Sequence, residues 1–225
     1  MICVLNLKAR MSSAAAYTRL REEIPAAVRI IAVSKMQNLA AIQAVYGAGC
    51  RDFGENYLQE ALDKIKAWPD PSVCWHFIGR IQSNKVKEIA QYFHVVHSVD
   101  RVSIAAKLNR VCESLGKTLP IFLQVNVDRE PQKAGILPED LPEVVCEVVR
   151  FPRLQLQGLM EIPAVGNRQA FAALRSLRDY VSSATGIALP HLSMGMSQDY
   201  EVAVSEGATE VRLGTVIFGY RAVAC

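Results

Sequence analysis

The sequence predicts a single (β/α)8 barrel of the TIM type, in one domain over residues 1–225, with an extra helix before the first strand. Apolar segments typical of strands alternate eight times with segments typical of helices, and such alternation builds a parallel sheet. No low-complexity linker divides the chain, and its 225 residues, 51% of them hydrophobic, can bury one large core. An open doubly wound sheet is the alternative, but no G-x-G-x-x-G follows the first predicted strand.

The predicted strands are short apolar runs that end at polar residues. Residues 30–33 read Ile-Ile-Ala-Val, a continuous apolar run typical of a strand buried on both faces, and Lys35 lies at its carboxyl end. In chain order, the predicted strands are residues 28–35, 52–56, 73–79, 93–99, 120–127, 154–160, 189–194 and 210–213.

The predicted helices are indicated by apolar residues three or four positions apart and by residues that favour helix ends. In residues 57–68, for example, Leu58, Ala61, Leu62 and Ile65 share one face. The first helix has Ser12 or Ser13 as its N-terminal cap and Pro25 after its end, and the second has Asn38 as its cap and Gly47 or Gly49 at its end. Three later helices are followed by residues that end helices: Pro69 and Pro71 after residues 57–68, Gly116 after residues 102–115, and Gly186 after residues 169–182. The predicted helices are residues 11–24, 38–46, 57–68, 86–91, 102–115, 141–149, 169–182 and 200–205.

Composition argues against several functional classes. The net charge of +3, with no block of like charges, gives no indication of nucleic-acid binding, and 7% aromatic residues offer no base-stacking platform. None of the six cysteines forms a C-x-x-C pair, which indicates free thiols in a reducing compartment. Residues 1–10 do not resemble a signal peptide, and no apolar run approaches the roughly 20 residues of a membrane span. We therefore expect a soluble, cytoplasmic protein.

Polar and special residues collect where the predicted strands end, and in a barrel these ends converge on one face. They are Lys35, Asn56, His76, Asp100, Asn126 and Asp128, residues 194–197, and residues 212–215. The other histidines, His94, His97 and His191, lie in or beside strands and are interpreted as structural, and no pair has metal-ligand spacing on one helix. We predict no metal site.

Two loops at this face are typical of a phosphate site. Gly195 and Ser197 follow the seventh strand, Gly214 and Thr215 follow the eighth, and barrels often bind phosphate there. A lysine in a pocket loses hydration, which favours the neutral amine that attacks a carbonyl to form an imine. Lys35 together with a phosphate cradle therefore suggests pyridoxal 5′-phosphate (PLP). An arginine such as Arg212 beside the cofactor's ring nitrogen would keep that nitrogen neutral, although a strand-end ion pair is the alternative.

These motifs resemble those of the pyridoxal-phosphate homeostasis protein family, a relative of the barrel domain of alanine racemase. The matching segments span residues 28–220, nearly the whole chain, and occur in order. They are residues 32–35, 52–57, 76–79 with 82–85, 97–100, 124–127, 133–135, 158–160, 192–197 and 212–219.

The resemblance implies a monomer in which Lys35 holds PLP covalently as a Schiff base. It assigns the phosphate to Ser197, Gly214 and Thr215, and the ring nitrogen to Arg212. It places Asn56 near the ring hydroxyl, with Met194 packed close by, and we expect His76 near the pocket. Lys133 matches a lysine that the family offers as a secondary cofactor contact. Three residues depart from the family pattern: Met36, Gln37 and Glu161.

The resemblance favours a carrier that stores, buffers or delivers PLP to apo-enzymes, without catalytic residues of its own. A PLP-dependent amino-acid racemase is the alternative. Racemases use the lysine and a tyrosine from a second domain as two opposed bases, and this chain ends after the barrel. A barrel that binds another phosphorylated metabolite, with Lys35 only as a charge partner, is the third interpretation.

Overall fold

The computed structural model describes residues 11–164 and 167–219, and within them the chain forms a closed barrel of eight parallel strands. The strands follow one another around the barrel in sequence order, and β1 closes the ring by pairing with β8. Their bounds are β1 Arg29–Val33, β2 Asp52–Glu55, β3 Cys74–Phe77, β4 Val95–Val99, β5 Leu119–Gln124, β6 Leu154–Met160, β7 His191–Met196 and β8 Glu210–Leu213. The predicted barrel is confirmed.

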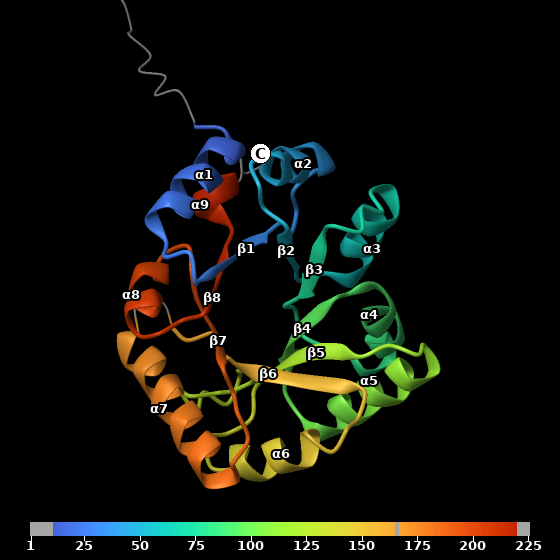
Figure 1. The fold of residues 1–225 in the computed structure, drawn as a ribbon, viewed down its shortest axis with the longest axis vertical. Coiled ribbons are helices and arrows are strands. Elements are labelled where there is room, and N and C mark those ends of the chain that lie inside the picture. Colours follow the sequence, from blue (N-terminus) through green and yellow to red (C-terminus); the bar gives the residue numbers. More distant parts are fainter. Residues whose placement is uncertain (1–10, 165–166, 220–225) are drawn as a thin grey trace, which may run out of the picture.

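The helices form an outer layer around the strands (Figure 1). Their bounds are α1 Ser13–Glu23, α2 Leu39–Gly47, α3 Leu58–Ala67, α4 Val86–Tyr92, α5 Val102–Ser114, α6 Leu141–Val148, α7 Arg168–Thr185, α8 Tyr200–Ser205 and α9 Thr215–Phe218, with a short 3-10 turn, η1 Ser83–Lys85. The extra helix α1 begins at the cap residue Ser12, whose hydroxyl accepts from Ala15 N–H, and packs against α2 and α9.

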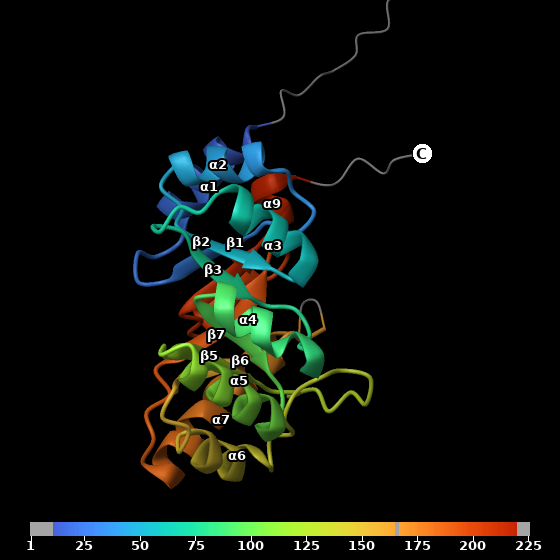
Figure 2. The same ribbon diagram turned by 90° about the vertical axis from the view of Figure 1, so that its right-hand side faces the viewer.

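Two differences from the predicted elements affect the site. The first strand ends at Val33, because Ser34 and Lys35 lie in a turn in which Gln37 N–H donates to the Ser34 carbonyl. Residues 215–218, for which we predicted no helix, form α9 directly after β8. Both differences lie where the strands end, and Figure 2 shows the barrel from the side, with the loop after β5 extending from it.

The hydrophobic core has two parts. Most of it fills the layer between the barrel and the helices, with large buried side chains such as Trp75, Phe93 and Phe171. A second cluster of Val95, Phe122 and Met160 is separate from that layer. In the described residues no helix is long and apolar enough to cross a membrane. Cys50, Cys74, Cys112 and Cys146 are free thiols, whereas Cys3 and Cys225 lie outside the described residues. Residues 1–10, which we expect not to form a signal peptide, also lie outside the described residues.

Candidate functional site

The main candidate site is a cavity of about 470 Å³ where the strands end. Six of the predicted site residues line it: Lys35, Asn56, Ser197, Arg212, Gly214 and Thr215. The remaining wall is formed by Val33, Ile78, Ile162, Met196, Gln198 and Asp199. Residues from six parts of the chain thus meet at one face, as a barrel requires, while their roles toward a ligand stay predictions.

The turn that carries Lys35 is held in place by the buried ion pair between Lys64 and Glu55. Lys64 of α3 donates to the Ser34 carbonyl and to Glu55 Oε1, both at 2.8 Å, and Ser34 Oγ donates to the same Glu55 oxygen at 2.6 Å. Lys64 also contacts Glu60 at 2.6 Å, and Glu60 in turn accepts from Met36 N–H. Burial raises the pKa of Glu55, against the effect of Lys64 and Ser34. The Lys64 ammonium therefore links β1, β2 and α3 beneath Lys35.

The loops after β7 and β8 meet at Ser197. Its Oγ accepts from the backbone N–H groups of Gly214 at 3.0 Å and Val216 at 3.4 Å. The turn before it requires glycine, since Gly195 has φ +89° and a Cβ there would lie 2.5 Å from Ala203 Cβ. A Cβ at Gly214 would be in ordinary van der Waals contact with Val33, at 3.6 Å, so this position does not require glycine for lack of space.

Arg212 lines the cavity and donates three hydrogen bonds. Its Nη1 donates to the carbonyl and the hydroxyl of Ser193, at 2.7 and 2.8 Å, and its Nη2 donates to the Glu161 carbonyl at 2.7 Å. The side chain is only 4% exposed, and burial lowers its pKa to about 10, against the charges of Glu161, Glu210 and Asp199. At neutral pH Arg212 is a fixed positive charge.

A chain of buried hydrogen bonds continues behind Arg212 through the barrel interior. His97 Nδ1 lies 3.0 Å from Ser193 Oγ, His97 Nε2 lies 2.9 Å from His76 Nδ1, and His76 Nε2 lies 3.0 Å from Asp52. Asp52 lines a separate cavity with Arg29 and Glu210. Both imidazoles are fully buried, and His97 stacks on Phe122 with ring centroids 4.4 Å apart.

The two imidazoles differ in charge. Burial lowers the pKa of His76, but hydrogen bonds with Asp52 and Cys74 and the charges of Cys74 and Glu210 outweigh it and raise that pKa to about 9. Burial and the charges of His76 and Arg212 lower the pKa of His97. His76 is therefore charged at neutral pH and donates to neutral His97, whose other nitrogen donates to Ser193.

This arrangement predicts a pH-dependent stability. Because the folded-state pKa of His76 is raised, its contribution is complete below pH 6.5 and is lost as the pH rises through about 9. Urea unfolding at pH 6.5 and 9.5 should show that wild type loses on the order of 3 kcal/mol more of its unfolding free energy than His76→Gln. Equal losses in the two proteins would mean that His76 is not charged in the folded state.

Two predicted site residues lie elsewhere. His76 was expected near the pocket, but it is not among the lining residues and its ring is engaged inside the barrel. Met194 is fully buried in the core between barrel and helices, because its neighbour Ser193 points into the barrel and side chains alternate along a strand. If the alternation along β7 had been assigned with Ser193 and not Met194 facing the barrel interior, the sequence would have identified Ser193 as the residue that contacts Arg212.

Two buried oxygens in the main cavity wall are left without partners. Among the residues the structure describes, Asn56 Oδ1 and Asp199 Oδ2 have no hydrogen-bond partner. The other Asp199 oxygen accepts from Met196 N–H at 2.6 Å. Buried polar atoms are rarely left unsatisfied, so these two atoms mark positions for a ligand or water. Asp199 was not predicted as a site residue, although it closes the Gly195–Ser197 turn.

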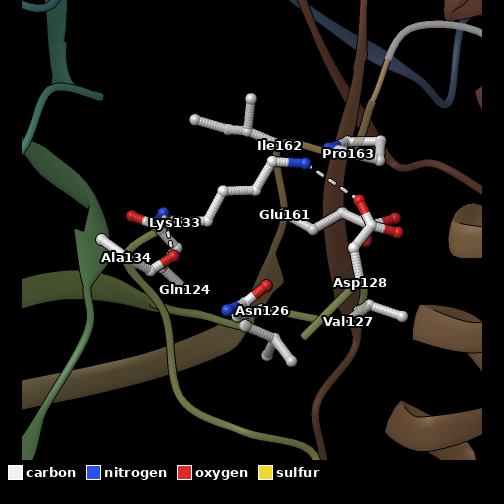
Figure 3. A pocket seen from close by; sticks show the side chains of 10 residues that line it. Gln124, Asn126, Val127, Asp128, Lys133, Ala134, Glu161, Ile162 and Pro163 are labelled. Atoms are coloured by element: carbon white, nitrogen blue, oxygen red, sulfur yellow. Dashed lines mark hydrogen bonds and ion pairs between the residues drawn. The ribbon is translucent and has the colours of Figure 1, made fainter. Parts of the chain in front are cut away.

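A smaller cavity of about 190 Å³ adjoins the main one and shares Ile162 with it (Figure 3). Figure 3 shows the Lys133 side chain spanning this cavity toward Asp128, which it contacts at 3.0 Å. Glu161, at the end of β6, is 1% exposed and also lines the cavity. Lys133, which was matched to a secondary lysine of the family, and Glu161, which departs from the family pattern, thus line one cavity, and Lys35 is not among the lining residues of that cavity.

Comparisons with known proteins identify the family of this chain. The family model for the N-terminal domain of alanine racemase matches residues 12–222. The pyridoxal phosphate homeostasis protein of Pseudomonas aeruginosa is 48% identical over 202 residues, covering 88% of this chain and 86% of the relative. The Escherichia coli K12 protein of that name is 39% identical over 212 residues, covering 88% and 87%.

Solved structures give the same result. PipY from Synechococcus elongatus, in a structure described as having PLP bound, superposes with a TM-score of 0.87 at 38% identity, covering 92% of this chain and 100% of PipY. Alanine racemase from Clostridium difficile shares the fold, with a TM-score of 0.76 at 11% identity over 93% of this chain and 57% of the racemase. The chain belongs to the pyridoxal phosphate homeostasis proteins, within the alanine racemase N-terminal domain family.

Proposed function

We propose that this protein binds PLP covalently through Lys35 and stores, buffers or delivers it, without catalysing a reaction of its own. The observation that carries the proposal is the meeting of Lys35, Arg212 and the Ser197–Gly214–Thr215 loops in one cavity. Relatives that match this chain over most of their length are named homeostasis proteins, which supports a carrier. Apo-enzymes as recipients and a monomeric state belong to the same proposal.

The residues present fit the cofactor. Ser197, Gly214 and Thr215 line the cavity together, and the two hydroxyl groups could donate to a phosphate there. The unpartnered Asn56 Oδ1 can accept from the ring hydroxyl. When bound, PLP supplies an aldehyde, and the Lys35 amine condenses with it to a carbon–nitrogen double bond with loss of one water. Arg212, already held by three hydrogen bonds, would present a fixed cation to the ring nitrogen.

An absorbance spectrum tests this function directly. Protein incubated with PLP should show a visible band near 420 nm, as a rough expectation for a lysine-bound cofactor. Borohydride should remove the band, and peptide mass mapping should then find the pyridoxyl group on Lys35. A protein that stays colourless with added PLP would overturn the proposal and favour a barrel for another phosphorylated metabolite.

Arg212→Lys should weaken PLP binding by about tenfold or more, because lysine keeps the charge but cannot hold the two Ser193 contacts and the Glu161 carbonyl in one planar fork. Titration of apo-protein with PLP, followed by the visible band, measures the affinity. Arg110→Lys is the matched control, since Arg110 is exposed on α5. Wild-type affinity in Arg212→Lys would show that the fork does not matter to the cofactor.

A further inference from the structure

The smaller cavity beside the PLP site contains a buried carboxyl group that the protein itself does not satisfy. Within residues 11–164 and 167–219, Glu161 Oε1 has no hydrogen-bond partner, although its side chain is almost completely buried. Figure 3 shows the Glu161 side chain extending in the direction of Asp128. A buried polar atom of this kind calls for a partner that enters from the cavity.

The other polar side chains of the cavity are already engaged. Lys133 contacts Asp128 at 3.0 Å and Glu130 at 2.5 Å. Asp128 also accepts from Ala164 N–H at 3.2 Å and from Asn167 at 2.9 Å. Glu161 is therefore the lining side chain that is left to bind a ligand.

The engaged groups include Asn126 and Gln124. Asn126 exchanges two hydrogen bonds with the Glu130 backbone, at 2.9 and 3.2 Å. Gln124 donates its amide to the Ala134 carbonyl at 2.9 Å. Both side chains are thus oriented by the loop after β5, and this leaves the cavity with a fixed wall opposite Glu161.

The charges around the cavity select the kind of ligand. Once Glu161 is ionised, it and Asp128 carry two negative charges against the single positive charge of Lys133, and Glu130 further neutralises that lysine. A phosphate would face the Asp128 carboxylate, a carboxyl that ionises near pH 8 and a lysine that is already paired twice, whereas an ammonium group offers only donors to the unpartnered oxygen. At about 190 Å³ the cavity accommodates a small molecule.

We propose that this cavity binds the ammonium group of a small primary amine, with the Glu161 carboxylate as its acceptor. The site is distinct from the Lys35 cavity but next to it, since Ile162 lines both and the Glu161 carbonyl accepts from Arg212. Primary amines are the compounds that exchange with a lysine-bound carbonyl. The proposal goes beyond the PLP function and does not depend on it, because it concerns apo-protein residues alone.

Binding should release a proton. Burial and the charge of Asp128 raise the pKa of Glu161 to about 8, against Arg212 and Lys133, and Asp199 adds to the rise. The Glu161 carboxyl of the apo-protein is therefore mostly protonated at pH 7, and an ammonium group that binds to it displaces the proton into solvent. Below pH 8 the affinity should rise by up to about tenfold per pH unit, and above pH 8 it should level off.

Calorimetric titration of apo-protein with n-propylammonium chloride, between pH 6 and 9 and in two buffers of different ionisation enthalpy, tests this. We expect binding that strengthens with pH and releases close to one proton at pH 6.5. Glu161→Gln, which keeps the side-chain shape, should weaken binding at pH 8 by about tenfold or more and remove the pH dependence. Glu113→Gln, an equal charge change at an exposed position on α5, is the control and should bind like wild type.

Lys133→Met separates this site from a phosphate site. Loss of the competing cation should strengthen n-propylammonium binding, whereas it would abolish binding of inorganic phosphate to a site built on Lys133. Phosphate binding by wild type without n-propylammonium binding, or equal amine binding by Glu161→Gln and wild type, would overturn the proposal. These titrations contain no PLP, so their failure is distinguishable from failure of the PLP function.

Discussion

Lys35→Ala is expected to remove the PLP-dependent visible band and the borohydride-trapped adduct completely. The substituted side chain carries no amine, while Ser197, Gly214 and Thr215 still line the cavity and can hold the phosphate. Residual PLP binding should therefore be weaker than in wild type and reversible on dialysis. Absorbance and mass mapping after reduction measure both results.

The stability of the apo-protein shows whether this loss is chemical or structural. Lys35 is half-buried in a turn outside β1, so Lys35→Ala should change the unfolding free energy by no more than about 1 kcal/mol. Lys87→Ala, at an exposed position on α4, is a matched control and should retain the band. A full visible band in Lys35→Ala would mean that another amine carries the cofactor.

Lys64→Met should destabilise the protein by about 3–5 kcal/mol, since it leaves Glu55 buried without its counter-ion. The Glu55 side chain is inaccessible to solvent, and its second oxygen already lacks a partner in the described structure. The substitution also removes one of the two hydrogen bonds to the Ser34 carbonyl and leaves the one from Gln37 N–H, so the turn that carries Lys35 should hold PLP less tightly. Urea unfolding of apo-protein and PLP titration measure the two effects.

A double substitution identifies the cause. Lys64→Met combined with Glu55→Gln removes both charges, and it should recover a large part of the lost stability because no uncompensated ion stays buried. Lys87→Met, an exposed lysine with the same change, should shift stability by less than about 0.5 kcal/mol. If Lys64→Met and Lys87→Met unfold at the same urea concentration, the Glu55–Lys64 pair is not a buried constraint.

Local sequence patterns were sufficient for the barrel and for half of the residues that line the main cavity. The apolar run at residues 30–33 and its seven counterparts predicted strands because a parallel strand is covered on both faces. Lys35, Asn56, Ser197, Arg212, Gly214 and Thr215 could be placed together because parallel strands in a barrel end at one face. That reasoning needs only the order of the elements.

The positions of the two predicted residues that do not line the main cavity have one physical origin. His76 and Met194 also lie near strand ends, but the direction of a side chain depends on the register and irregularities of its strand, such as the shift between Ser193 and Met196 in the β7–β8 pairing. Which histidine is charged depends on neighbours from other strands, since Asp52 of β2 holds His76 of β3. No local pattern contains such contacts.

The sequence by itself determined the barrel, its family and the residues around Lys35, because periodicity and ordered motifs are properties of the chain. Only the tertiary structure decided how these residues are supported: Lys64 beneath the Lys35 turn, Ser193 and the Glu161 carbonyl on Arg212, and the Glu161 carboxyl in its own cavity. Burial and charge at those positions arise from segments distant in sequence, and they exist only once the barrel has closed.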